Sequence, residues 1–87
     1  LKPTLTSAWY YAGYLDTQNN KPIDAIKNYK RTLEIDPSYT KAYLSIAKAY
    51  LEIENKKEAI RYLKHGIKVT NQSSDLVKLL DEIIQDK

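Results

Sequence analysis

Side chains that could perform catalysis or hold a metal are few in this sequence, and they form no recognisable site. The 87 residues include no Cys and a single His, His65, which excludes a cysteine nucleophile, a Cys-based zinc site and a pair of histidine ligands. The carboxylates Glu52, Glu54 and Glu58 gather near a predicted turn, where they would suit an acid–base pair or a calcium ion. However, the sequence lacks the Asp-x-Asp-x-Asn-Gly spacing of a calcium loop and a Gly-rich phosphate loop. We therefore expect solvated side chains here, with no enzymatic activity, cofactor or metal.

Basic residues are the second candidate for chemistry, because clusters of them bind nucleic acid. The relevant residues lie on two predicted helices and are Lys27, Lys30, Arg31, Arg61, Lys64 and Lys68. Asp24, Glu34 and Glu58 fall among them at spacings that form ion pairs along a helix. The formal net charge of +3 is also small for a surface that must neutralise several phosphates. Nucleic-acid binding is therefore not expected.

The elements that position these residues are predicted to be helices. Only two Gly and three Pro occur in the chain, which favours helices over a turn-rich β fold. The 43% hydrophobic and 29% charged content is typical of one globular domain. No apolar run reaches the roughly 20 residues that cross a bilayer, so no membrane insertion is expected. Because the chain does not begin with Met and shows no signal peptide, we expect a fragment of a larger protein, whose localisation the sequence leaves open.

Four breaks divide the chain into five predicted helices, at residues 19–21, 36–37, 54–55 and 71–73. Pro22 suits the first turn of a helix, where no amide hydrogen is needed, and Asp36 is biased away from the helical region by Pro37. The predicted N-caps are Thr6 or Ser7, Ser38, and Ser73 or Ser74. Helical spacing predicts apolar buried faces that include Leu15, Ile23, Ile26, Leu33, Ile35, Leu76, Val77, Leu80, Ile83 and Ile84.

A 34-residue period relates the first four predicted helices. Trp9 and Tyr43 are separated by 34 residues, and so are Ala25 and Ala59. The two copies agree in residue class rather than in identity, with aromatic on aromatic and small on small. Such a period is typical of a helical repeat array, in which stacking of neighbouring units completes the core.

The period and its residue classes resemble the tetratricopeptide repeat (TPR), whose pattern is W-x2-L-G-x2-Y, then A-x3-F, then P. The first copy reads Trp9, Ala12, Gly13, Asp16, Ala25, Tyr29 and Pro37. The second copy reads Tyr43, Ile46, Ala47, Tyr50, Ala59, Leu63 and Asn71, and a partial third copy reads Val77, Leu80, Asp81 and Ile84. The resemblance implies an all-α, TPR-type right-handed superhelix of antiparallel helical hairpins with five helices. It divides the chain into an N-terminal lead-in (1–5), repeat 1 (6–39), repeat 2 (40–73) and a C-terminal capping helix, or partial repeat 3 (74–87).

Three residues depart from the TPR pattern. Asp16 stands where an aromatic residue is usual, which predicts an irregular end to the first helix. Asn71 replaces the proline, and Asp81 replaces a small residue on a helix whose outer face would meet water.

Small residues are expected where helices cross closely, since axes approach to about 8 Å only between small side chains. We expect Gly13 to face Ala25 in the first hairpin and Ala47 to face Ala59 in the second. The residues that the resemblance assigns to packing of the repeats are Trp9, Gly13, Ala25, Tyr29, Pro37, Tyr43, Ala47 and Ala59.

In TPR proteins the first helix of each hairpin lines a concave groove that binds partners, so the resemblance implies a non-catalytic protein–protein interaction module. The peptide-binding residues that it implies are Tyr10, Tyr11, Tyr14, Lys41, Leu44, Ser45, Lys48 and Leu51. Further groove positions are Ser7, Gln18, Asp75, Lys78, Leu79 and Glu82. We expect a peptide or helix with apolar anchors, steered by Lys41 and Lys48.

Two other interpretations of the groove remain open. Tyr10 and Tyr14 would also suit packing on an upstream repeat outside this chain, and a homo-oligomeric scaffold would assemble through the groove or the ends of the array. A clamp for a chaperone's C-terminal carboxylate is disfavoured. The clamp positions hold Tyr10, Tyr14, Ser45, Asp75 and Leu79 in place of Lys, Asn and Arg.

Overall fold

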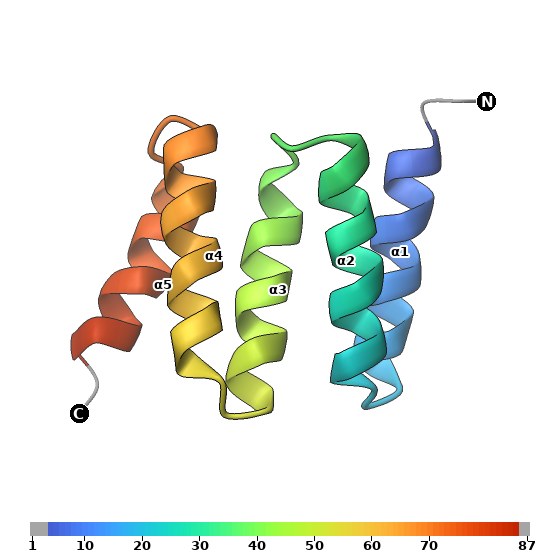
Figure 1. Cartoon of the computed structure of the whole chain (residues 1–87), viewed down its shortest axis with the longest axis horizontal. Helices are drawn as coiled ribbons and strands as arrows, with labels where there is room; N and C mark the ends of the chain where they lie inside the picture. Colours follow the sequence, from blue (N-terminus) through green and yellow to red (C-terminus); the bar gives the residue numbers. More distant parts are fainter. Residues whose placement is uncertain (1–3, 86–87) are drawn as a thin grey trace.

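The computed structural model describes residues 4–85, which form five α-helices joined by short turns (Figure 1). The helices are α1 (Thr4–Gln18), α2 (Pro22–Ile35), α3 (Thr40–Glu52), α4 (Lys56–Val69) and α5 (Ser74–Gln85). Successive helices run antiparallel and stand side by side in a flat array of 44 × 30 × 15 Å. Over the described residues no strand occurs, so the predicted all-α class with five helices in hairpins is confirmed. Residues 1–3 of the predicted lead-in and residues 86–87 of the predicted capping helix lie outside the described part.

The turns inside the two hairpins have the same backbone geometry 34 residues apart. Asn20 and Glu54 each adopt a left-handed conformation, with φ of 61° and 60°. The next amide then donates back to the helix, from Lys21 to the Asp16 carbonyl and from Asn55 to the Tyr50 carbonyl, at 2.8 Å in both turns. This is the hydrogen-bond pattern of a Schellman motif, which satisfies the last carbonyls of a helix.

The α4–α5 junction closes in the same way, although the α2–α3 junction does not. Asn71 has φ 58°, and the Gln72 amide donates to the Ile67 carbonyl at 2.8 Å. At the α2–α3 junction Asp36 has an extended conformation before Pro37. Asn71, which stands where the TPR pattern has proline, therefore ends α4 with a Schellman motif. Asn suits this position because it tolerates the left-handed conformation that the motif requires.

Helix starts agree with the sequence only in part. Pro22 occupies the first turn of α2, and the Asn55 side chain caps α4 by accepting from the Glu58 amide at 3.2 Å. The predicted Ser38 cap is wrong, since α3 begins at Thr40 and the Ser38 hydroxyl donates to Asp36 Oδ1 at 2.8 Å. The caps predicted at residues 6 and 7 are also wrong, because α1 begins at Thr4 and both residues lie inside the helix.

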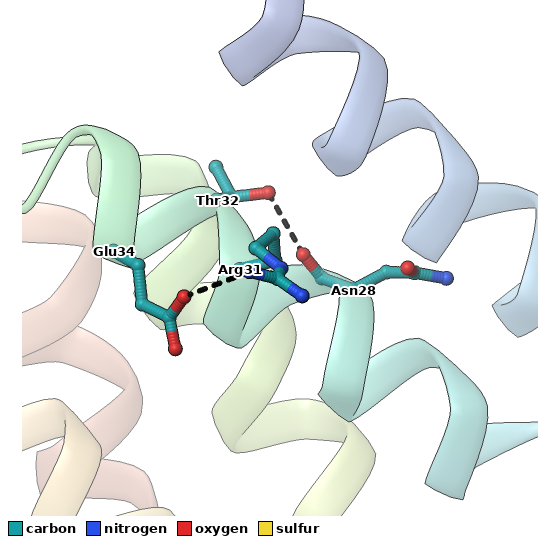
Figure 2. A network of polar contacts seen from close by, with 4 residues as sticks. All are labelled: Asn28, Arg31, Thr32 and Glu34. Atoms are coloured by element: carbon teal, nitrogen blue, oxygen red, sulfur yellow. Dashed lines mark hydrogen bonds and ion pairs between the residues drawn. The ribbon is translucent and has the colours of Figure 1, made fainter.

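The core runs along the array between the helices. Its largest fully buried side chains are Tyr29, Tyr43, Ile46, Leu63 and Leu76, together with the polar Thr32. Figure 2 shows how Thr32 is accommodated, with its hydroxyl donating to the Asn28 carbonyl one turn earlier at 3.0 Å. The small packing residues Ala25, Ala47 and Ala59 are fully buried.

Several residues predicted to be buried are exposed at the margins of the array. They are Leu15, Ile23, Ile35 and Ile84. Each lies near the end of a helix or on an outer helix, where neighbours cover only part of the apolar stripe. Trp9 is similarly only partly buried, with the Arg31 guanidinium 5.2 Å from its ring centroid, whereas the matching Tyr43 in the second hairpin is 2% exposed.

Both glycines lie inside helices at points of close approach. A Cβ at Gly13 would stand 2.6 Å from Tyr29 Cε1, so the close partner of Gly13 is the Tyr29 ring rather than the predicted Ala25. A Cβ at Gly66 would stand 2.6 Å from Tyr43 Cγ and 2.9 Å from Leu76 Cδ1. Gly66 therefore allows α4 to pack against α3 and α5 at once.

Candidate functional site

A groove of about 350 Å³ lies between α1 and α3, the first helices of the two hairpins. Its lining residues are Tyr10, Tyr14, Thr17, Gln18, Tyr29, Leu44, Ser45, Lys48, Ala49 and Glu52. Five of the eight predicted peptide-binding residues are among them: Tyr10, Tyr14, Leu44, Ser45 and Lys48. The structure thus brings the main part of the predicted set together on one surface.

The groove continues towards the C-terminus as a smaller cleft of about 170 Å³ between α3 and α5. Leu44 and Lys48 line both cavities and join them. The α5 wall consists of Asp75, Lys78, Leu79 and Glu82, all four of which the sequence placed on the groove.

Tyr10 is a fixed part of the groove wall. Its hydroxyl is 3.2 Å from the Ser45 hydroxyl, which links α1 to α3. Its ring centroid lies 5.4 Å from that of Tyr29 and 5.3 Å from that of Tyr39. Since tilted aromatic pairs at these distances stabilise packing, Tyr10 supports the fold as well as the groove surface.

Tyr14 is the more accessible aromatic residue of the groove, with 46% of its surface exposed. It stacks against Tyr11 with ring centroids 6.1 Å apart and an interplanar angle of 19°. Tyr11 is 59% exposed but does not line the groove. Together they form an exposed, stacked aromatic pair, of which Tyr14 lines the groove.

Two other predicted residues lie away from the groove. Lys41 borders a separate depression near the start of α3, with Asp36 and Tyr39. Leu51 is partly buried and packs against the core. The charged residues that would attract a partner therefore differ from the predicted pair of Lys41 and Lys48. Lys48 and Lys78 line the groove and its continuation, together with Glu52, Asp75 and Glu82.

Three polar or aromatic groove residues were not assigned to the groove from the sequence: Thr17, Tyr29 and Glu52. The Thr17 hydroxyl donates to the Gly13 carbonyl at 3.1 Å and lies 3.1 Å from the Tyr29 hydroxyl. Burial raises the pKa of Tyr29, so its phenol stays protonated at neutral pH. Glu52 follows Lys48 by four residues and therefore lies on the same side of α3. This spacing could have predicted from the sequence that Glu52 lines the groove.

Between residues 4 and 85 no group of three His, Cys, Asp or Glu side chains is placed to hold a metal ion. His65 is exposed, and its ring centroid lies 5.9 Å from that of Tyr43. None of the five helices has the length and apolar character needed to cross a membrane. The groove and its continuation combine aromatic side chains, an apolar centre at Leu44 and charges of both signs.

Comparison with known proteins relates this chain to a protein family and to a mouse protein. The family model described as "Regulator of microtubule dynamics protein 1-3" matches residues 5–87. The PEX5-related protein of Mus musculus is 30% identical over 76 residues, which cover 87% of this chain. The same match covers 13% of the mouse protein, so the chain spans a small part of the length of that relative.

Proposed function

Since the chain belongs to the regulator of microtubule dynamics protein 1-3 family, we propose that it is a non-catalytic interaction module of a larger protein. The module binds a partner peptide or helix in the groove between α1, α3 and α5. The observation that carries this proposal is the convergence of Tyr14, Leu44, Ser45 and Lys48 on one groove. Small-residue crossings and Schellman turns hold the walls of this groove in place.

The hairpins themselves are proposed to be tetratricopeptide repeats. Support comes from the 34-residue spacing of residue classes and from the matching turns at Asn20 and Glu54. In this arrangement the first helices supply the binding surface, and the second helices hold the first helices in register.

Binding would depend on one apolar contact and a set of polar contacts around it. The stacked pair of Tyr14 and Tyr11 and the side chain of Leu44 would receive an apolar side chain of the partner. Gln18, Lys48 and Glu52 surround this area and would hydrogen-bond to the backbone or polar side chains of the partner. Aromatic residues at the centre of an interface commonly carry a large share of the binding free energy.

The test is a selection of peptides from a random displayed library against this chain, followed by calorimetric titration of the recovered peptide. Tyr14→Ala should weaken binding by roughly 2 kcal/mol, which is the scale of an aromatic hot spot. Lys27→Ala on α2 is the matched control and should change the affinity by less than about 0.5 kcal/mol. Peptides that bind Tyr14→Ala as tightly as the original chain would contradict the placement of the site.

The description of the family refers to regulation of microtubule dynamics, so we propose a component of the microtubule system as the partner. Cosedimentation with stabilised microtubules tests this directly. Binding that Tyr14→Ala reduces and Lys27→Ala preserves is the expected result. If the chain does not cosediment, the microtubule polymer itself is not the partner.

A second candidate function is self-assembly into a scaffold, and a specific surface favours it. Val77, Leu80 and Ile84 lie on one stripe of α5, the last helix described, and Ile84 is 57% exposed. Such a stripe can pack on a second copy. Light scattering should then show a dimer that Ile84→Ser dissociates, whereas a monomer at high concentration would refute assembly.

A further inference from the structure

The charge of the chain is distributed unequally between the two sets of helices. The second helices of the hairpins, α2 and α4, carry eight basic residues against three acidic ones. The helices that line the groove, α1, α3 and α5, carry three basic residues against five acidic ones. The excess positive charge of the protein therefore lies on α2 and α4, away from the groove.

Two of the three acidic residues on α2 and α4 are already paired along their own helix. Glu34 accepts from Arg31 at 3.5 Å, as Figure 2 shows, and Glu58 accepts from Arg61 at 3.0 Å. Each pair engages only the Nη1 of its arginine, and the guanidinium of Arg61 is largely exposed, so its other N–H groups can still donate to a second carboxylate. Lys27, Lys64 and Lys68 form no ion pair within the described part of the chain, and they leave an unbalanced positive field around α2 and α4.

A cleft of about 280 Å³ opens within this positive field, between α2 and α4. Leu33, Pro37 and Tyr43 supply apolar lining, and Lys30 and His65 stand among its polar lining. A second hollow of about 300 Å³ adjoins it through the shared residues Tyr62 and His65 and extends the surface to Arg61. We call these two joined hollows the α2/α4 cleft.

The α2/α4 cleft and the groove open on different sides of α3. Tyr43 lines the cleft, and Lys48 lines the groove. At 3.6 residues per turn these two positions are separated by roughly 140° around the helix axis. A partner bound in one cavity would therefore leave the other free.

Lys30 is held at the cleft by aromatic side chains. Its Nζ lies 5.8 Å from the ring centroid of Tyr50 and 5.8 Å from that of Tyr62. The two rings stack with their centroids 5.7 Å apart. Hydrogen bonding to Tyr50 raises the pKa of Lys30, so the ammonium remains charged at neutral pH. A positioned cation of this kind gives an anion a defined point of contact.

We propose that the α2/α4 cleft is a second interaction site, distinct from the groove, and that it binds an acidic polypeptide segment in extended form. Carboxylates of that segment pair with Lys30 and Arg61, and Lys64 and Lys68 attract it from a distance. Its aliphatic stems cover Leu33 and Pro37. The basic excess of α2 and α4 supplies the charge complementarity that commits the site to an acidic partner.

Features of the lining favour a polypeptide over a nucleic acid. Single-stranded nucleic acids depend on open aromatic faces for base stacking. Here Tyr43 and Tyr50 are buried, and Tyr62 stacks on Tyr50.

The test is fluorescence anisotropy at low salt with a labelled peptide of about a dozen residues that alternates pairs of glutamate with glycine. The double variant Lys30→Gln, Arg61→Gln should lower its affinity about tenfold, because each solvated ion pair contributes up to about 1 kcal/mol and 1.4 kcal/mol corresponds to tenfold. The matched control is Lys48→Gln, Lys78→Gln, which removes the same charge from the groove and should lower affinity less than about twofold. Melting followed by circular dichroism checks that both double variants remain folded.

Each contrary result overturns the proposal. Equal losses of affinity in the two double variants would show that only the net charge of the protein matters. Equal binding of a peptide with glutamine in place of glutamate would exclude recognition of carboxylates. Tighter, equally variant-sensitive binding of a single-stranded oligonucleotide with the same number of charges would make the cleft a nucleic-acid site. The outcome is independent of the groove, because none of the cleft variants alters a groove residue.

Discussion

Gly66→Ala is expected to destabilise this protein, although the same change in an open helix would stabilise it. Alanine favours a helix interior over glycine by up to about 1 kcal/mol. At position 66, however, the added Cβ would lie 2.6 Å from Tyr43 Cγ and 2.9 Å from Tyr43 Cβ, well inside contact distance. These atoms are next to the α3 backbone, and the Tyr43 hydroxyl is anchored to the Pro37 carbonyl at 2.6 Å. Tyr43 therefore cannot move aside unless α3 moves as well.

The magnitude follows from two opposing contributions. Overpacking in a dense core costs about 1–3 kcal/mol, and the upper end applies because the obstructing atoms are close to the main chain. After the gain in helix propensity, we expect a net loss of about 2 kcal/mol in the free energy of unfolding. Urea denaturation followed by circular dichroism measures this loss. Lys64→Ala, on the exposed side of the same helix, is the control and should stay within about 0.5 kcal/mol. A Gly66→Ala variant that is more stable than the original chain would refute the close approach of α4 to α3.

Three further predictions concern the turns and the buried tyrosines. Glu54→Gly should raise the free energy of unfolding by about 1 kcal/mol in urea denaturation, because Glu54 has φ 60° and glycine avoids the cost of the left-handed conformation. Asn55→Ala should lower it by about 1 kcal/mol in the same assay through loss of the α4 cap, whereas Asn19→Ala should have little effect. Burial raises the pKa of Tyr29 and Tyr43 above the usual value of 10.0, so the folded state keeps these protons longer than the unfolded state. The stabilisation that comes from these two buried phenols should therefore be fully present below about pH 10 and should fall as the pH rises beyond it. Urea denaturation midpoints measured on either side of pH 10 test this. They would show no fall if the phenols were solvated.

The helix ends show how much of the fold the sequence determines locally. Pro22 and the Asp36–Pro37 pair were sufficient to place two boundaries, since proline restricts its own φ and the conformation of the preceding residue. The Ser38 cap failed because α3 begins only at Thr40, and the Ser38 hydroxyl donates to Asp36 Oδ1 instead of accepting from a helix amide. Hydroxyl side chains can donate to or accept from several neighbouring groups, and only the folded backbone decides among them.

The groove residues show what helical spacing can and cannot predict. Tyr14, Leu44 and Lys48 could be placed from the resemblance to a repeat, because helical spacing fixes which residues share a face. The spacing could not show that Tyr10 bonds to Ser45 and packs on Tyr29. Whether a tyrosine on the binding face is free or fixed depends on the side chains that the neighbouring helix brings to it.

The sequence by itself determined the all-α class, the number of helices and the period that relates them, because apolar spacing and helix breakers act over a few residues. The tertiary structure decided which atoms meet at the crossings: Tyr29 against Gly13, and Tyr43 and Leu76 against Gly66. It also decided that a cleft opens between the basic helices α2 and α4, on a different side of α3 from the groove. Contacts of this kind depend on the distance and rotation between helices that are remote in the chain. Those quantities are set by packing of the whole core rather than by any local segment.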